Sequence, residues 1–108
     1  MQLDQLLFLG THGHVKAVRK DDGSDVWVVS LPGTGYEVVT LLYEDGTLFA
    51  GSNGKLFGLD PSDGSILWSN SLSGLGYDHM VLATVRGASG HPQHASAEDE
   101  ERRRRSSS

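Results

Sequence analysis

The chain contains an internal repeat of 41 residues. Shifting the sequence by this distance aligns residues 7–46 with residues 48–87 without a gap, and fifteen of the forty pairs are identical. Average composition would give roughly three identities by chance. The identical pairs include the two tryptophans, Trp27 and Trp68, and six glycine pairs. A repeat of this length predicts two copies of one supersecondary unit that bury their apolar faces against each other.

Each repeat is predicted to form four short strands joined by tight turns. The dipeptides His12-Gly13 and Asn53-Gly54 lie between short apolar runs, and Asn-Gly is a strong signal for a two-residue β-hairpin. The predicted strands are 7–11, 14–19, 25–31 and 38–43 in the first repeat, and 48–52, 55–60, 66–72 and 79–85 in the second. Four strands in about 40 residues are typical of a β-propeller blade, with a small two-sheet sandwich as the alternative.

A spaced motif supports the propeller. It consists of a small residue, an aspartate two positions later, a glycine four beyond it and a tryptophan four beyond that, and the second repeat carries it as Gly58, Asp60, Gly64 and Trp68. The first repeat has Ala17, Gly23 and Trp27, with Arg19 in place of the aspartate. The motif resembles the blade repeat of pyrroloquinoline-quinone-like propellers, the quinoprotein alcohol dehydrogenase-like family. The resemblance implies an all-β propeller of two 41-residue, four-stranded blades per chain, in which the tryptophans dock one blade on the next.

The resemblance also implies that the chain is incomplete as a propeller. In the family the innermost strand precedes the Leu-Phe strand, so residues 37–43 begin the blade that ends near residue 72. The first blade then lacks its inner strand, and residues 79–85 form a spare one. We expect residues 1–87 to be a two-blade unit (repeats 6–46 and 47–87) whose strand 79–85 is exchanged with a neighbouring copy. Propellers have 4–8 blades. Head-to-tail closure therefore predicts a trimer of six blades or a tetramer of eight, and the resemblance favours the tetramer. The alternative is a piece cut from a longer propeller.

One rim of the propeller is the predicted ligand site. The motif Gly-x-Gly-Tyr-acid occurs in both repeats, and the hairpin tips should lie beside it. Aromatic faces next to carboxylates and amides suit a carbohydrate or another small polar ligand, whereas the structural reading is that the glycines make turns and the tyrosines pack between blades. The candidate residues are Tyr36, Glu37, Tyr77, Asp78, His12, His14, Asn53 and Lys55.

No enzymatic chemistry is predicted. Family members that oxidise alcohols or sugars bind their quinone over a full ring and often use adjacent cysteines, while this chain has two blades and no cysteine. We therefore expect no catalytic residue and no cofactor, with a quinone-dependent dehydrogenase fragment as the least favoured alternative. The closely spaced histidines His12 and His14 are a candidate pair of metal ligands. Asn53 and Lys55 replace them in the second repeat, so no metal site is predicted. The prediction is a non-enzymatic, self-assembling scaffold, with lectin-like binding at the rim as the alternative.

The net charge and the hydropathy of the chain argue against two kinds of partner, nucleic acid and a membrane. The 14 acidic and 9 basic residues give a net charge of −5, which argues against nucleic acid. No apolar run approaches a membrane span, and the N-terminus lacks the basic region of a signal peptide, so a cytoplasmic protein is expected. Residues 88–108 combine opposed charge blocks with a serine run, which predicts a disordered tail.

Overall fold

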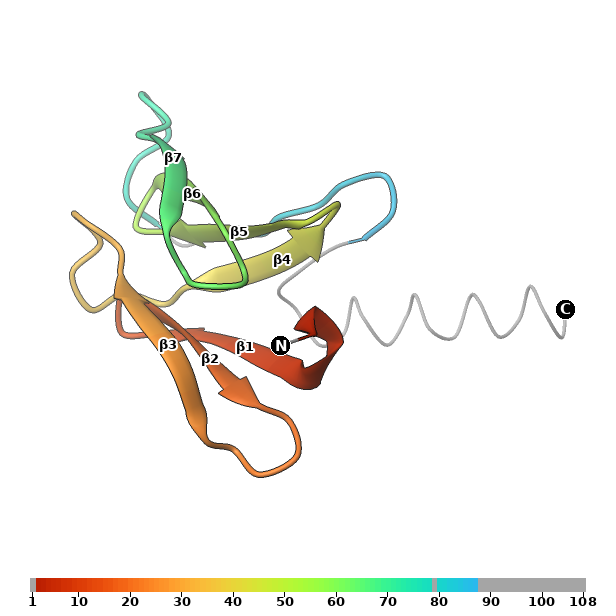
Figure 1. Ribbon diagram of the computed structural model, residues 1–108. Helices are drawn as coiled ribbons and strands as arrows, with labels where there is room; N and C mark the ends of the chain where they lie inside the picture. Colours follow the sequence, from red (N-terminus) through yellow and green to blue (C-terminus); the bar gives the residue numbers. More distant parts are fainter. Residues whose placement is uncertain (1, 79, 88–108) are drawn as a thin grey trace, which may run out of the picture.

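The computed structural model describes residues 2–78 and 80–87, which form two antiparallel β-sheets (Figure 1). A single 3-10 turn, η1, precedes the first strand. The first sheet has the order β1-β2-β3 and the second the order β4-β5-β6-β7. The elements are η1 (Leu3–Gln5), β1 (Leu6–Thr11), β2 (His14–Arg19), β3 (Asp25–Ser30), β4 (Thr40–Glu44), β5 (Thr47–Ser52), β6 (Lys55–Leu59) and β7 (Ile66–Asn70). The predicted all-β class is confirmed.

Seven of the eight predicted strands are present, with small shifts at their ends. The inner strand β4 begins at Thr40 rather than at residue 38, because the loop before it stays irregular as far as Val39. The predicted strands 25–31 and 66–72 end earlier, at Ser30 and Asn70.

The eighth predicted strand, 79–85, is expected to pair with a neighbouring copy, and this pairing stays a prediction. Residues 80–87 contain only an isolated bridge at Ala83, and His79 lies outside the described residues. Within the described residues the segment does not extend as a further strand of either sheet. The predicted disordered tail, 88–108, also lies outside the described residues.

Tight hairpins of one design join the first two strands of each repeat. Thr11 lies opposite His14, and Ser52 lies opposite Lys55, so each loop has two residues. Both residues of each loop have positive φ: 56° and 71° at His12 and Gly13, and 50° and 74° at Asn53 and Gly54. This is the geometry of a type I′ turn, whose twist matches that of the flanking strands.

The core lies between the two sheets. Its buried members are Val15, Leu31, Val39, Leu48, Ala50, Phe57 and Leu59. Phe8 and Trp27 of the first sheet pack against this cluster, as does Leu41 of the second. Side chains alternate between the two faces of a strand, so one face of each sheet belongs to this core and the other faces away from it. The sheets are therefore stacked as neighbouring blades, and each repeat donates one face to a shared core.

Candidate functional site

The structure brings the predicted rim loops together in both repeats. The hairpin tips lie against the Gly-x-Gly-Tyr loops: the Gly13 N–H donates to the Glu37 carbonyl at 2.9 Å, and the Gly54 N–H donates to the Asp78 carbonyl at 3.1 Å. A Cβ on Gly13 would lie 2.0 Å from the Gly35 carbonyl oxygen, so only glycine allows this approach. The two repeats thus present equivalent clusters at one end of the sheets.

The first rim cluster consists of His12, His14, Tyr36 and Glu37. The rings of His12 and Tyr36 are stacked with centroids 4.0 Å apart, and the His14 ring lies 6.3 Å from His12. His14 Nδ1 is 2.7 Å from the His12 carbonyl oxygen. Tyr36 remains 75% exposed although the second sheet lies beside it, so its ring does not fill the space between the blades.

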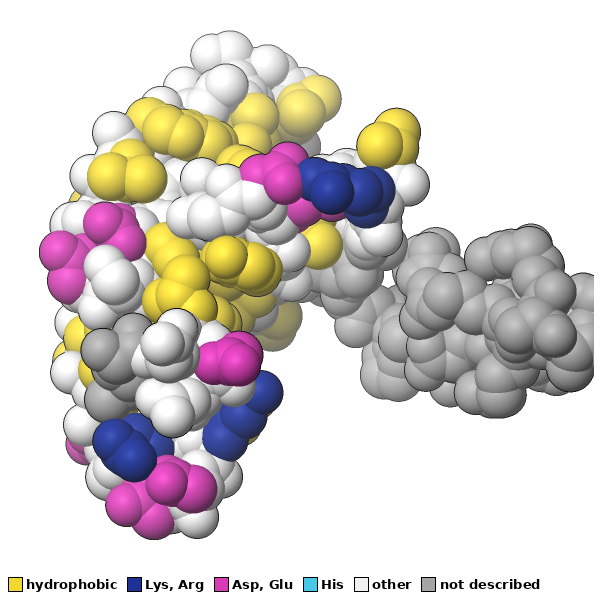
Figure 2. Space-filling model, turned by 45° about the vertical axis from the view of Figure 1, so that its right-hand side comes forward, with side chains coloured by type: hydrophobic (Ala, Val, Ile, Leu, Met, Phe, Trp, Pro, Cys, Tyr) yellow, Lys and Arg dark blue, Asp and Glu magenta, His cyan; other side chains and the backbone are white. Residues whose placement is uncertain are grey.

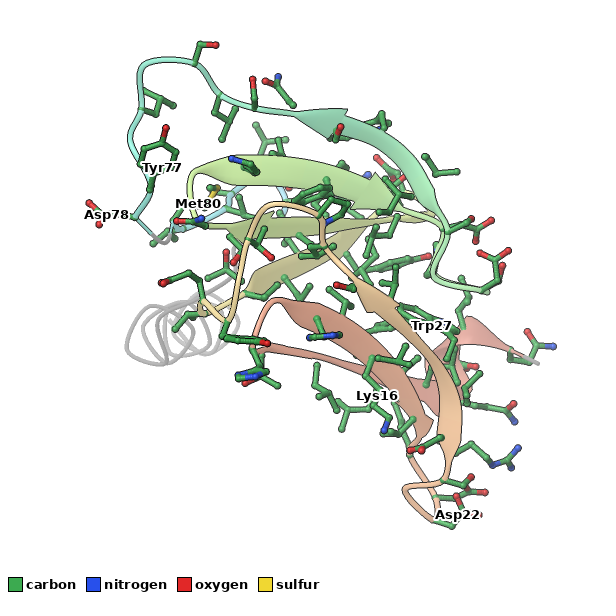
Figure 3. All side chains as sticks on the ribbon, turned by 90° about the vertical axis from the view of Figure 1, so that its left-hand side faces the viewer. Lys16, Asp22, Trp27, Tyr77, Asp78 and Met80 are labelled. Atoms are coloured by element: carbon green, nitrogen blue, oxygen red, sulfur yellow. The ribbon has the colours of Figure 1, made fainter. Side chains whose placement is uncertain are left out.

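The second rim cluster consists of Asn53, Lys55, Tyr77 and Asp78. The Lys55 ammonium lies 5.5 Å from the centroid of the Tyr77 ring, within cation–π range, and Tyr77 is 73% exposed. Asn53 Nδ2 donates to the Gly33 carbonyl at 3.2 Å and so ties this cluster to the loop of the first repeat. Figure 3 shows Tyr77 and Asp78 on the loop that projects from the second sheet.

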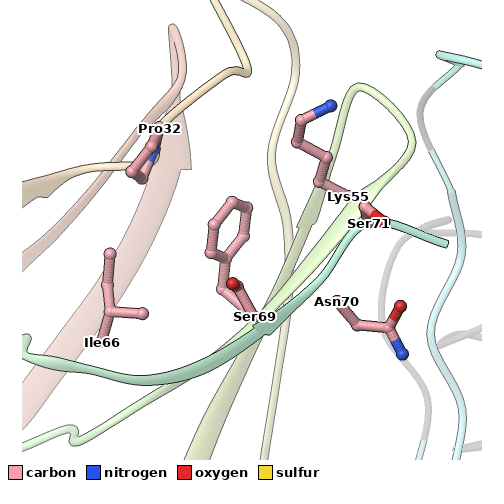
Figure 4. A pocket seen from close by; sticks show the side chains of 7 residues that line it. Pro32, Lys55, Ile66, Ser69, Asn70 and Ser71 are labelled. Carbon is pink, nitrogen blue, oxygen red and sulfur yellow. The ribbon is translucent and has the colours of Figure 1, made fainter.

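Two hollows meet at Lys55. The larger, of about 480 Å³, lies beside Tyr77 and is lined by Lys55, Ser71, Leu72, Ser73, Gly74, Gly76 and Tyr77. The smaller, of about 200 Å³, lies between Pro32 and the second sheet (Figure 4). Hydroxyl and ammonium groups with one exposed aromatic face make the larger hollow suitable for a small polar ligand.

Trp27 docks the first sheet on the second. Its indole N–H donates to the Pro61 carbonyl at 2.9 Å. A Cβ on Gly64 would lie 2.4 Å from the Trp27 ring, so the indole lies directly on this glycine. Pro61 and Gly64 are both buried by the contact. Asp60 holds the same turn by accepting hydrogen bonds from the backbone N–H and hydroxyl of Ser62.

Trp68 has the same position one repeat later but only its own blade to pack on. It lies over Gly58, with its ring 6.1 Å from Phe49, much as Trp27 lies 6.0 Å from Phe8. It is 41% exposed. The counterpart of Gly64 in the first repeat is Gly23, which is exposed and has no atom within 4 Å of the place of its Cβ. One docking tryptophan and one docking turn thus remain without partners among the described residues.

The outer faces of the two sheets are likewise incomplete. We call the face of the first sheet that carries Leu7 and Leu9 the leading face, and the face of the second sheet that carries Phe49 and Trp68 the trailing face. Leu48 in the core is 1% exposed, whereas its counterpart Leu7 on the leading face is 53% exposed. Figure 2 shows hydrophobic side chains gathered in bands at the surface, between groups of charged ones.

Residues 80–87 lie on the trailing face. Leu82, Ala83 and Thr84 line a hollow of about 210 Å³ together with Leu42, Phe49 and Leu56. A Cβ on Gly51 would lie 2.6 Å from Met80 Sδ, and a Cβ on Gly10 would lie 2.8 Å from Val39 Cβ. Met80 and Val39 are one repeat apart, as are Gly51 and Gly10. The segment therefore covers the second sheet in the way that the approach to β4 covers the first.

Arg86 fixes the end of this segment, a role that the sequence analysis missed. Arg86 Nε lies 3.3 Å from Glu44 Oε2, and its guanidinium also binds Asp45. The hydrogen bond and the charge of Asp45 raise the pKa of Arg86 above its ordinary value. Asp45 and Arg86 occupy equivalent positions one repeat apart, but the offset alone does not predict their contact, which depends on how the segment packs on the second sheet.

Comparison with known proteins identifies the family. A family model described as outer membrane protein assembly factor BamB, a PQQ-like repeat, matches residues 11–99. A search of the curated proteins gives no match. The described residues contain no helix that could cross a membrane, and within the same residues no three histidine or acidic side chains gather in a way that could hold a metal ion. The matched range spans both sheets apart from the start of the first, and the chain belongs to the PQQ-like β-propeller repeat family.

Proposed function

We propose that the chain is a self-associating β-propeller subunit, a non-enzymatic scaffold whose copies join head to tail into a closed ring. The proposal rests on residues that occupy equivalent positions in the two repeats but differ in whether they lie between the sheets or at an outer face. Trp27, Leu48 and Ala50 lie in the contact between the sheets, whereas their counterparts Trp68, Leu7 and Leu9 lie at outer faces.

The two outer faces are equivalent in position to the two sheet faces that meet in the core. The leading face has Leu7 and Leu9 where the second sheet has Leu48 and Ala50 in the core, while Lys16 stands at the position of the buried Phe57 and is paired with Asp25. The trailing face has Phe49 and Trp68 where the first sheet has Phe8 and Trp27. A contact between the leading face of one copy and the trailing face of another would therefore resemble the contact within the chain, with Lys16 in the place of Phe57. Such a heterologous contact closes into a ring when its rotation permits. Self-association would also cover apolar faces and an unpaired strand edge that otherwise favour aggregation.

Native mass spectrometry tests this proposal. With two blades per chain, a ring of six or eight blades contains three or four copies, so the expected mass is three or four times the 11.6 kDa of one chain. A single closed species of either mass supports the proposal. A monomer at micromolar concentration, or an open series of sizes, contradicts it and favours a piece of a longer propeller.

A lectin-like role is the second candidate, favoured by the exposed tyrosines of the rim. Tyr77 and Lys55 line a polar hollow large enough for one sugar ring, and Tyr36 presents the ring face that His12 does not cover. Saturable binding of a sugar in calorimetry, lost in both Tyr36→Ala and Tyr77→Ala, would support this role. Tyr43→Ala is the matched control, because this tyrosine is outside both rim clusters. The absence of binding across a panel of neutral and acidic sugars would count against it.

A further inference from the structure

We propose that residues 81–85 of one copy form the inner strand that the first sheet of the next copy lacks, antiparallel to its β1 and in one defined register. In this register Thr84 lies opposite Leu7 of the next copy, and Ala83 lies opposite Phe8. The inference rests on the proposed self-association and specifies the surface that carries it.

The register follows from the complete blade. In the second sheet Tyr43 lies opposite Leu48, and Leu42 lies opposite Phe49. Advancing the β4 residues by one repeat gives Thr84 and Ala83, and moving the β5 residues back by one repeat gives Leu7 and Phe8. Because successive side chains on a strand point to opposite faces, a slip of one residue would move Leu82, the counterpart of Leu41, from the face of Leu7 and Leu9 to the opposite face, so the apolar pattern selects this register.

The accepting edge belongs to β1. This strand pairs with β2 alone, while its counterpart β5 pairs with both β4 and β6. Within the described residues no strand takes the place of β4 beside β1. An edge with exposed leucines at positions 7 and 9 is a template for strand addition, in which backbone hydrogen bonds provide affinity and side-chain contacts provide specificity.

The donating segment already lies at the position that the pairing needs. Residues 82–84 cover Phe49 and Leu56 on the trailing face, and the ion pairs of Arg86 with Glu44 and Asp45 hold the end of the segment. Residues 82–84 are the segment whose sequence fits the β1 edge, and they already lie on the trailing face. In the ring, the trailing face of one copy meets the leading face of the next, so the occupant of the β1 edge is a second copy of this chain rather than an unrelated peptide.

A second contact accompanies the strand. Trp27 donates its indole N–H to the Pro61 carbonyl and lies on Gly64. Shifting this contact by one repeat places Trp68 on Gly23 of the next copy, with its indole N–H at the Lys20 carbonyl. Gly23 is exposed and has open space at the position of its Cβ, as a receiving site requires.

Disulfide trapping between two variants tests the register. The chain has no cysteine, so introduced thiols are the only ones. Directly opposed residues in an antiparallel pair have Cβ atoms about 4.5–5.5 Å apart, close to the distance that a disulfide spans. We expect a mixture of Leu7→Cys and Thr84→Cys chains to give a covalent dimer under mild oxidation. Neither variant alone should do so. The adjacent pair Phe8→Cys with Ala83→Cys is a second trap, since the closer and wider pairs alternate along the ladder.

The matched control is Phe8→Cys mixed with Thr84→Cys, which is one residue out of register and places the thiols on opposite faces. At least a tenfold lower yield of dimer is expected from it. A covalent homodimer of Leu7→Cys alone would indicate a symmetric interface and overturn the inference. If the native mass shows a ring but neither in-register pair crosslinks, the ring stands and this strand pairing is wrong. If no ring forms, the proposed function itself fails.

Discussion

At the scale of single residues, the two tryptophans show how position in the molecule decides the role of a side chain. The sequence assigns Trp27 and Trp68 the same motif position, and both lie similarly over their own sheets. Trp27 also contacts the turn of the next sheet through Pro61 and Gly64, whereas Trp68 has no such turn within the described residues. Trp27 therefore stabilises the chain, and the proposed ring would give Trp68 its partner.

Substitution of each tryptophan by alanine should separate folding from assembly. Trp27→Ala should lower the free energy of unfolding of the chain by about 3 kcal/mol, because it removes a large side chain from the contact between the sheets. Trp68→Ala should leave a folded chain of monomeric mass. Urea unfolding followed by tryptophan fluorescence, together with native mass spectrometry, measures both effects. An intact ring in Trp68→Ala would contradict the assigned role.

The acidic turns offer a second test at this scale. Asp63 accepts hydrogen bonds from the Ser65 backbone N–H and hydroxyl at 2.9 and 2.8 Å, and these bonds lower the pKa of the Asp63 carboxyl. A carboxyl with a lowered pKa stabilises the fold above its ordinary pKa, and this contribution is lost as the pH falls through the folded-state pKa. Ser65→Ala removes the hydroxyl donor, so the pKa of Asp63 should rise in an NMR titration. Asp22, held in the same way by Ser24, is the unchanged internal control.

At the scale of the elements, local patterns located the strands that have partners inside the chain. β2 has the predicted ends, because its two neighbours fix them through continuous pairing. The segment 79–85 has the same apolar pattern as the inner strand, but local sequence does not show which strand it pairs with, so its pairing with a neighbouring copy stays a prediction. The rim loops were placed correctly because glycine turns are local signals, whereas the Arg86–Asp45 pair depends on how the blades stack.

Deletion of the donating segment tests the element-scale inference. Removal of residues 79–87, together with everything that follows, should abolish the ring and leave monomers or irregular aggregates, because the β1 edge then has no strand to accept. Removal of the residues after Gly87 alone should leave the ring unchanged. Size-exclusion chromatography with light scattering compares the two truncations. A clean ring formed by the shorter chain would exclude strand exchange as the mode of assembly.

At the scale of the whole molecule, the two blades formed by the described residues share one core, and the outer face of each sheet lies outside that core. Residues 2–78 and 80–87 form one core between the sheets, while each sheet has two faces. A ring would cover both outer faces with a contact similar to that core, so each chain would gain one further blade contact. Stability and assembly are then one property, as in other obligate oligomers.

This coupling predicts that thermal stability depends on chain concentration. Mass action favours the ring at high concentration, so the unfolding midpoint measured by circular dichroism should rise over a hundredfold increase in concentration. In Trp68→Ala the contact between copies is weakened, so the midpoint should be lower and nearly independent of concentration. A midpoint of the unaltered chain that does not move with concentration would mean that two blades are stable alone. The exposed leading face would then need an occupant other than a second copy of this chain.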